Sequence, residues 1–309
     1  MIGIKAIGTY LPAGRVSNLA RLEEFGLTEA SLNDRIGFRQ VAVKGGDETT
    51  LSLAVSAFRN LQDMIGLDLA SVDAVAVITQ NPDRNIPHLS AELHGKLALS
   101  PGCACFDISL GCSGYVYGLS LLSAFMSANG MHCGVLVTSD PYSGIVDPAD
   151  KNTSLIFGDG ATATLLTEDP VYVAGAYNLG TMGSEADNLA CNDGKLFMNG
   201  RAVFNFAAKY VPADVATTVQ KNGLTLAEVD CFILHQGSRY IVDTIADRLG
   251  VPHDKAKFYA ADYGNTVSSS IPIILAEAME NKSNRSILLS GFGLGFSWAS
   301  TVLKRLEEH

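Results

Sequence analysis

The chain has 309 residues, 47% of them hydrophobic, and carries a formal net charge of −10. A chain of this length can bury a large core, so we expect one large domain or two fused domains. The negative charge, with no dense block of Lys or Arg, excludes a basic patch for nucleic acid or for an anionic membrane surface.

The apolar runs and the cysteines narrow the class of protein further. No apolar run reaches the length of a membrane span without a Gly or polar interruption, and residues 1–7 lack the features of a secretory signal. We therefore expect a cytoplasmic protein. The six cysteines show no CxxC pairing and no clustering with histidine, so we expect reduced thiols, no disulfide framework, and no metal or cofactor.

Strands and helices alternate along the first half of the chain. The expected elements are a strand at 2–10, a helix at 48–65 with acidic residues in its first turn, a continuous apolar strand at 72–79, a helix at 90–99, a strand at 134–138 and a segment at 155–166. A continuous apolar strand is typical of a largely parallel sheet that is buried on both faces. The alternation predicts the α/β fold class.

Residues 104–118 are typical of a buried strand, a tight glycine-flanked turn, and a helix that continues to Asn129. Cys112 lies in the turn. A helix that begins at Ser113 directs its unpaired N–H groups at the sulfur, which lowers the pKa of the thiol and favours the nucleophilic thiolate. The alternative is a buried cysteine that acts as a small hydrophobic residue. This motif alone does not decide between the two.

The order of elements recurs in the second half at an offset of about 150 residues, the size of a duplicated domain. Three segments match in the same order: 229–236 with 72–79, 258–265 and the apolar helix 271–279 with 106–112 and its helix, and the final strand 287–290 with the region around 157–160. We therefore divide the chain into halves at 1–169 and 170–309. Residues 177–199, rich in Gly, Asn and Asp, are interpreted as a functional loop.

Duplication brings three side chains to one cavity. Packing about a pseudo-twofold axis makes the equivalent turns meet, so Cys112 and Asn265 face each other, and His235 comes from the carboxyl end of strand 229–236. A histidine can hold a cysteine as a thiolate or take its proton, and the thiolate can attack an acyl thioester. The imidazole and the Asn265 amide can both donate to the enolate oxygen that forms when a malonyl-type thioester loses carbon dioxide. Each residue taken singly also has a structural interpretation: His235 as a histidine whose hydrogen bonds are satisfied at a strand end, and Asn265 as part of a Gly-Asn turn.

Five motifs make the chain recognisable. They lie at 107–114, 157–160, 234–238, 263–266 and 291–298. Together they resemble the β-ketoacyl-acyl-carrier-protein synthase III family of the thiolase superfamily. The resemblance implies a five-layered αβαβα fold of two pseudo-repeated halves, usually a homodimer. It also implies Cys112 as the nucleophile, His235 and Asn265 as decarboxylation partners, and an oxyanion hole at the backbone N–H groups of Cys112 and Leu294.

Departures from the family pattern concern the acyl pocket and the donor site. Ser238 stands where typical members have an asparagine and replaces only part of its hydrogen bonding. Leu294 takes the middle place of three usual glycines, which implies a smaller or reshaped acyl pocket. Ile86 marks the place where one subunit reaches into the acyl tunnel of the other.

The resemblance also assigns the positions that bind the acyl donor. Two arginines and a tryptophan commonly hold the coenzyme A adenine; here Arg35 matches one arginine, Lys151 stands at the other, and Ser31 stands at the tryptophan. This set weakens adenine recognition. Asn205 and Tyr240 stand where cations that meet the carrier protein are frequent. The nearby basic residues are Arg239, Arg248, Lys255 and Lys257.

We therefore expect an acyltransferase that loads an acyl group on Cys112 and condenses it with a malonyl thioester, with release of carbon dioxide. Its partners are then acyl and malonyl thioesters of acyl carrier protein or coenzyme A, and a second copy of the chain. One rival is a relative in secondary metabolism that transfers its acyl group to an amine, alcohol or β-keto acid without decarboxylation. The other is a non-catalytic partner subunit, a class that typically lacks the cysteine.

Overall fold

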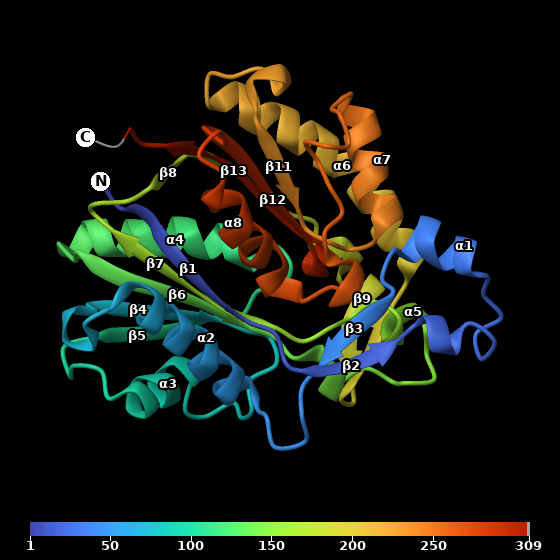
Figure 1. The fold of residues 1–309 in the computed structure, drawn as a ribbon, viewed down its shortest axis with the longest axis horizontal. Helices are drawn as coiled ribbons and strands as arrows, with labels where there is room; N and C mark the ends of the chain where they lie inside the picture. The colour runs from blue at the N-terminus through green and yellow to red at the C-terminus, as the bar shows by residue number, and fades with distance from the viewer. Residues whose placement is uncertain (308–309) are drawn as a thin grey trace.

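The computed structural model describes residues 1–307, and its centre is a nine-stranded mixed sheet in the order β11-β12-β13-β8-β1-β7-β6-β4-β5 (Figure 1). Its strands are β1 (Gly3–Tyr10), β4 (Ala74–Ile78), β5 (Ala104–Ile108), β6 (Cys133–Ser139), β7 (Ala161–Thr167), β8 (Tyr172–Thr181), β11 (Cys231–Leu234), β12 (Ser286–Gly293) and β13 (Ser297–Arg305). β1 and β8 are joined by the single pair Ile4 and Tyr172. The sheet therefore consists of two half-sheets that meet at this seam.

Helices cover and separate the two half-sheets (Figure 1). The longer helices are α2 (Thr50–Ile65), α3 (Leu89–Leu97), α4 (Gly114–Asn129), α6 (Gly200–Lys221), α7 (Arg239–Leu249) and α8 (Ser270–Glu280), and the short ones are α1 (Glu29–Ser31) and α5 (Lys151–Ser154). α2 and α3 lie outside the first half-sheet, α4 and α8 lie between the half-sheets, and α6 and α7 lie outside the second. This is the five-layered αβαβα arrangement, so the predicted fold class is confirmed.

Strand β4 shows why one segment of the sequence is apolar throughout. Val75 and Val77 pack in the cluster under α2 and α3, whereas Ala74, Ala76 and Ile78 pack in the middle cluster with α4 and α8. Successive side chains of a strand point to opposite faces, and here both faces are covered. β4 is parallel to both of its neighbours, β5 and β6, as the continuous apolar run predicts.

The strand order of the first half-sheet recurs in the second. β4 pairs parallel to β6, and β6 pairs antiparallel to β7; in the same way β11 pairs parallel to β12, and β12 pairs antiparallel to β13. Two details of the predicted repeat are wrong. Residues 258–265 contain a 3₁₀ turn, η7 (Ala260–Asp262), where the repeat predicts a strand equivalent to β5. The strand predicted to be the last is β12, and a further strand, β13, follows it.

Residues 177–199, interpreted from the sequence as a functional loop, are not a loop but largely regular structure. They contain the end of β8, a 3₁₀ helix, η5 (Gly183–Asn188), and a hairpin of β9 (Leu189–Asn192) and β10 (Lys195–Met198). The buried side chains of Leu189 and Leu196 anchor this hairpin in the core. Asp193 and Gly194 both have positive φ, at 50° and 75°, so the Asp-Gly pair was the overlooked signal for a tight hairpin turn.

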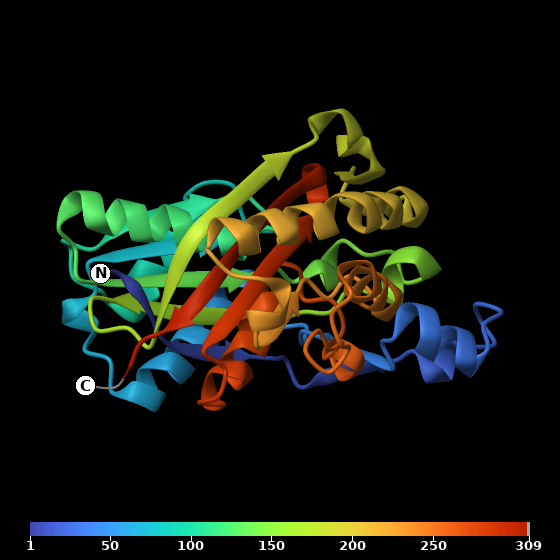
Figure 2. The same cartoon turned by 90° about the horizontal axis from the view of Figure 1, so that it is seen from above.

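The remaining segments lie at one end of the molecule. The two-stranded sheet of β2 (Gly14–Ser17) and β3 (Gln40–Val43) leads into and out of α1, which projects on the side of α7 in both views (Figures 1 and 2). The N-terminus and the end of β13 lie at the opposite end (Figure 2). Along residues 1–307, no helix combines the length and the apolar character that crossing a membrane requires.

Candidate functional site

Cys112 lies in the turn between β5 and α4, and its side chain is 4% exposed. Ser113 is the N-cap residue of α4, as the sequence predicts. The end of β12 packs directly on this turn. A Cβ on Gly291 would lie 2.6 Å from the carbonyl oxygen of Cys112, and a Cβ on Gly293 would lie 2.8 Å from its Sγ. Only glycine allows this approach, so β12 contacts the nucleophile through its backbone.

Burial dominates the acid-base behaviour of the Cys112 thiol. It raises the pKa of Cys112 to about 12, and the nearby Asp140 carboxylate acts in the same direction. The backbone N–H groups of Leu294 and of Cys112 itself point at the sulfur and lower the pKa, but they offset only part of the cost of burial. The predicted lowering of the thiol pKa is therefore wrong for the resting protein, in which Cys112 is a neutral thiol.

His235 follows β11 and is 3% exposed. Its Nδ1 lies 2.7 Å from the Oγ of Ser270, the first residue of α8, and its ring meets the Phe292 ring edge to face, with 5.6 Å between the centroids. Burial lowers the pKa of His235 to about 3. The imidazole is therefore neutral at physiological pH, and it can serve as a hydrogen-bond donor without carrying a charge.

Asn265 is 3% exposed, and its Nδ2 lies 3.4 Å from the Nε2 of His235. The orientation of the amide follows from a second contact, because the Val267 N–H donates to Asn265 Oδ1 at 2.9 Å. Val267 has a φ of 52°, which is rare for a β-branched residue and marks local backbone strain. If the Ser270 hydroxyl donates to Nδ1, then His235 Nε2–H and Asn265 Nδ2–H are two donors that can share one oxygen acceptor.

The titration of Cys112 yields a testable prediction. Because the pKa of Cys112 is about 12, its alkylation by iodoacetamide should accelerate about tenfold per pH unit between about pH 7 and pH 10. Cys105 is a comparison in the same chain, because the neighbouring Cys103 lowers the pKa of Cys105 below its usual value and its rate should rise less steeply with pH. Peptide mass spectrometry at each pH separates the two thiols. A plateau for Cys112 near neutral pH would contradict the assignment.

Within residues 1–307, the other predicted site positions make no hydrogen bond or ring contact with the cysteine, histidine and asparagine described above. Ser238 caps α7, because its Oγ accepts from the Ile241 N–H at 3.2 Å. The guanidinium of Arg239 lies over the Phe258 ring, 4.8 Å from its centroid. Three positions lie on exposed segments: Arg35 in the helical turn η2 (Leu32–Ile36), Lys151 at the start of α5, and Ile86, which is 86% exposed.

Sequence reasoning missed the residues that orient the site. Ser270 contacts His235, and Val267 contacts Asn265. Asp140 is fully buried and accepts hydrogen bonds from Ser268 Oγ at 2.6 Å and from the Gln80 N–H at 2.8 Å. Burial raises the pKa of Asp140 to about 6 in spite of these bonds. The serine run directly after the Asn265 motif was the available signal.

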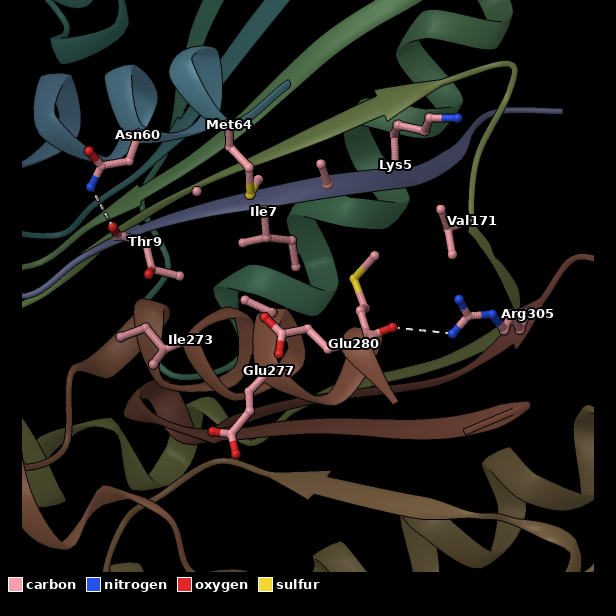
Figure 3. Close-up of a pocket in the computed structure, with 14 residues that line it drawn as sticks. Lys5, Ile7, Thr9, Asn60, Met64, Val171, Ile273, Glu277, Glu280 and Arg305 are labelled. Carbon is pink, nitrogen blue, oxygen red and sulfur yellow. Dashed lines mark hydrogen bonds between the residues drawn. The ribbon is translucent and has the colours of Figure 1, made fainter. Parts of the chain in front are cut away.

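A cleft of about 560 Å³ lies elsewhere, between α2, β1 and α8 (Figure 3). Its polar groups include Lys5, Glu277 and Glu280, while Arg305 at its rim bonds the carbonyl oxygen of Met279 at 3.2 Å. Its lining contains neither cysteine nor histidine, so it offers neither a thiol nor an imidazole for acyl transfer. Within the described part of the chain, no group of three or more His, Cys, Asp or Glu side chains could hold a metal ion.

The five-layered fold with its buried cysteine, histidine and asparagine is typical of acyltransferases of the thiolase superfamily. Comparisons with known proteins identify the family. The family model for 3-oxoacyl-acyl-carrier-protein synthase III matches residues 106–183, and the model for its C-terminal region matches 219–305. The chain belongs to the β-ketoacyl-acyl-carrier-protein synthase III family, so the predicted resemblance and the predicted enzyme class are confirmed.

Individual relatives support this over nearly the whole chain. The β-ketoacyl-acyl-carrier-protein synthase III of Oenococcus oeni is 34% identical over 97% of this chain and 99% of that protein. The corresponding protein of Streptococcus sanguinis is 31% identical over 97% of this chain and 98% of its own. The solved synthase III structure from Thermus thermophilus has a TM-score of 0.91 at 30% identity, covering 99% of this chain and 100% of that one.

Proposed function

We propose that Cys112 carries the acyl intermediate of a decarboxylative condensation, with His235 and Asn265 acting on the malonyl thioester. The observation that carries this assignment is the meeting of the two nitrogen donors, 3.4 Å apart, on residues held by Phe292 and Val267, which belong to the same apolar cluster as Cys112. In the first step, the sulfur attacks the carbonyl carbon of an acyl thioester. The bond to the donor sulfur breaks, and the leaving thiolate takes the proton lost by Cys112.

The backbone contacts of Cys112 supply the electrostatic help for this step. The N–H groups of Cys112 and Leu294 point at the space around the sulfur, and we assign them to the oxyanion of the tetrahedral intermediate. A pKa of about 12 means that the resting thiol is weakly nucleophilic. Because His235 presents Nε2–H as a donor and burial lowers its pKa to about 3, the thiol proton passes to the leaving sulfur of the acyl donor and the imidazole stays neutral.

The second step, decarboxylation of the malonyl thioester and condensation, relies on neutral hydrogen-bond donors. The carboxylate of the malonyl thioester leaves as carbon dioxide, and its electron pair becomes an enolate whose oxygen lies between His235 Nε2–H and Asn265 Nδ2–H. The enolate carbon then attacks the acyl carbonyl carbon, and the Cys112 thiolate leaves and takes up a proton. The proton that restores the Cys112 thiol comes from solvent, so one turnover consumes one acyl group, one malonyl thioester and one proton and releases one carbon dioxide.

Donor binding and the division of the chain are also part of this proposal. We assign Arg35, Lys151, Ser238 and Arg239 to the donor site, whose thioester is carried by acyl carrier protein or coenzyme A. The relatives named above act with acyl carrier protein by name. We keep the division at 1–169 and 170–309, which the recurring strand order supports.

We further propose that the chain forms a homodimer through β5, the last strand at one end of the nine-stranded sheet. An exposed strand edge invites pairing with a second copy. Nearby, the α4 side chain of Leu121 is 48% exposed, one turn from Phe125, whose ring contacts Phe106 of β5. Sedimentation should show a dimer that Leu121→Asp weakens, whereas Met64→Asp on α2, 56% exposed, should leave it intact. A monomeric parent chain at micromolar concentration would contradict the proposal.

The central test follows the covalent intermediate and the gas. The protein is incubated with acyl thioesters of coenzyme A and of acyl carrier protein, and intact-mass spectrometry followed by peptide mapping should locate one acyl group on Cys112. Addition of malonyl carrier protein should then release carbon dioxide and a β-ketoacyl product. Acyl transfer without carbon dioxide release would favour the non-decarboxylating alternative. Absence of any adduct with every donor would refute both.

A further inference from the structure

Three side chains converge on Gly111, the residue directly before the nucleophile. A Cβ at this position would lie 2.5 Å from Gln80 Oε1, 3.0 Å from Leu294 Cδ1 and 3.4 Å from Val267 Cγ1. Because Cys112 is the next residue, these groups occupy the space beside an acyl chain that starts at its sulfur. The bulk of Leu294 leaves little room there for a long chain.

A polar pair lies at the edge of this apolar surrounding, formed by the buried Tyr142 and the exposed Gln80. Tyr142 is 2% exposed, belongs to the same apolar cluster as Cys112, and packs its ring on Phe157 with 5.2 Å between the centroids. Its hydroxyl donates to Gln80 Oε1 at 3.3 Å. Among residues 1–307, this long hydrogen bond is the only one that the Tyr142 hydroxyl makes, and Gln80 Nε2 has no protein partner.

The hydroxyl will still be available as a donor when a substrate arrives. Burial, together with the nearby Asp140 and Cys112, raises the pKa of Tyr142 well above its usual value, so its proton stays in place. The backbone of Gln80 is held by the buried Asp140, which accepts from its N–H at 2.8 Å. The site therefore presents the N–H groups of the Gln80 amide, and a Tyr142 O–H whose long bond to Gln80 can be exchanged for one to a substrate oxygen.

A plain hydrocarbon acyl chain would cover these groups without bonding to them. The Gln80 amide would lose its hydrating water, and the Tyr142 hydroxyl would keep only its long bond to Gln80 Oε1. Both losses are unfavourable for polar groups that become buried. An acyl group with an oxygen would replace the lost water by direct hydrogen bonds. Sites built to bond a substrate hydroxyl discriminate strongly against the analogue that lacks it.

We propose that Gln80 and Tyr142, closed in by Leu294, form a subsite that selects a short acyl group carrying a hydroxyl or keto oxygen. This inference rests on the proposed function, because it concerns the acyl group loaded on Cys112. Gln80 and Tyr142 are specificity residues in this scheme. They take no part in bond making or breaking.

The test compares two donors that differ by a single oxygen. Equal amounts of butyryl-coenzyme A and 3-hydroxybutyryl-coenzyme A, each enantiomer in turn, compete for the protein, and the two Cys112 adducts are quantified by mass. We expect one enantiomer of the hydroxylated group to be preferred about tenfold or more. The same pair on acyl carrier protein separates acyl selection from recognition of the carrier.

Variants locate the preference in the subsite. Tyr142→Phe keeps the ring and removes the hydroxyl, and it should bring the ratio of the two adducts close to one by raising butyryl loading. Gln80→Leu, at an exposed side chain, should act in the same direction and serves if Tyr142→Phe folds poorly. Leu294→Ala should admit hexanoyl while keeping the oxygen preference. Tyr172→Phe removes the hydroxyl of another buried tyrosine, the first residue of β8, which donates to the carbonyl oxygen of Asn284; it is the matched control and should leave the ratio of the two adducts unchanged.

The outcomes separate the inference from the proposed function. Equal loading of both groups by the parent chain, or a ratio unchanged in both Tyr142→Phe and Gln80→Leu, would overturn the subsite while acyl transfer itself stands. If no thioester loads on any carrier, the proposed function fails, and the subsite fails with it.

Discussion

Asn265→Ala should lower the condensation rate about 10²–10³-fold, while acyl loading on Cys112 changes little. The Asn265 amide meets His235 at 3.4 Å and has its oxygen held by the Val267 N–H, so its free N–H faces the place of the enolate. Removal of one of two donors to a developing oxyanion affects the decarboxylation step selectively. Release of carbon dioxide from malonyl carrier protein, measured beside intact-mass acylation, separates the two steps.

The converse variant is the internal control for this prediction. Cys112→Ala should lose the acyl adduct entirely and still decarboxylate the malonyl thioester, because the Asn265 and His235 donors remain. Asn192→Ala, at an exposed position in β9, should behave like the parent chain in both assays. Equal loss of acylation and decarboxylation in Asn265→Ala would mean that the amide supports the fold of the site instead of the enolate.

Gly158→Ala should destabilise the protein by about 3 kcal/mol and reduce condensation at the same time. A Cβ on Gly158 would lie 2.0 Å from the carbonyl oxygen of Tyr263, a backbone atom that no rotamer change can move away. The N–H of Gly158 also donates to the carbonyl oxygen of Asn265 at 2.9 Å, so any shift of this contact moves the amide. Thermal or denaturant unfolding measures the first effect, and carbon dioxide release measures the second.

A second glycine supplies a matched comparison, in which substitution by alanine should change the stability in the opposite direction. Gly95 lies within α3, and a Cβ there would meet nothing within 4 Å. Gly95→Ala should therefore stabilise the protein by up to about 1 kcal/mol through helix propensity. If Gly158→Ala were tolerated as well as Gly95→Ala, the close packing between the Gly158 turn and the Asn265 loop would be refuted.

Gly158 and Gly291, which lie at contacts between the two halves, show how stability and catalysis are linked in this fold. Gly158 comes from the first half of the chain and Asn265 from the second, and a single parallel bridge joins Phe157 with Asn265. Cys112 likewise comes from the first half and Gly291 from the second. Their close approach allows the end of β12 to direct the Leu294 N–H at the sulfur. The site is therefore assembled only when the two halves are packed together.

Local patterns in the sequence were sufficient to predict much of this protein. The apolar run of β4, the glycine-flanked turn at Cys112 and the recurrence of the element order predicted the α/β class and two related halves. Motif resemblance then predicted the family, which the comparisons confirm. Such features depend on residues close together in the chain, where periodicity and turn chemistry act directly.

Contacts between distant segments decided the rest. Burial of Cys112 by the β12 backbone raises the thiol pKa, which reverses the effect that the local turn predicts, because desolvation here outweighs the nearby N–H groups. The hydrogen bond between Tyr142 and Gln80 joins residues 62 positions apart. A sequence names the groups that can ionise or donate, but only tertiary packing sets how much water each one loses and which partner it faces.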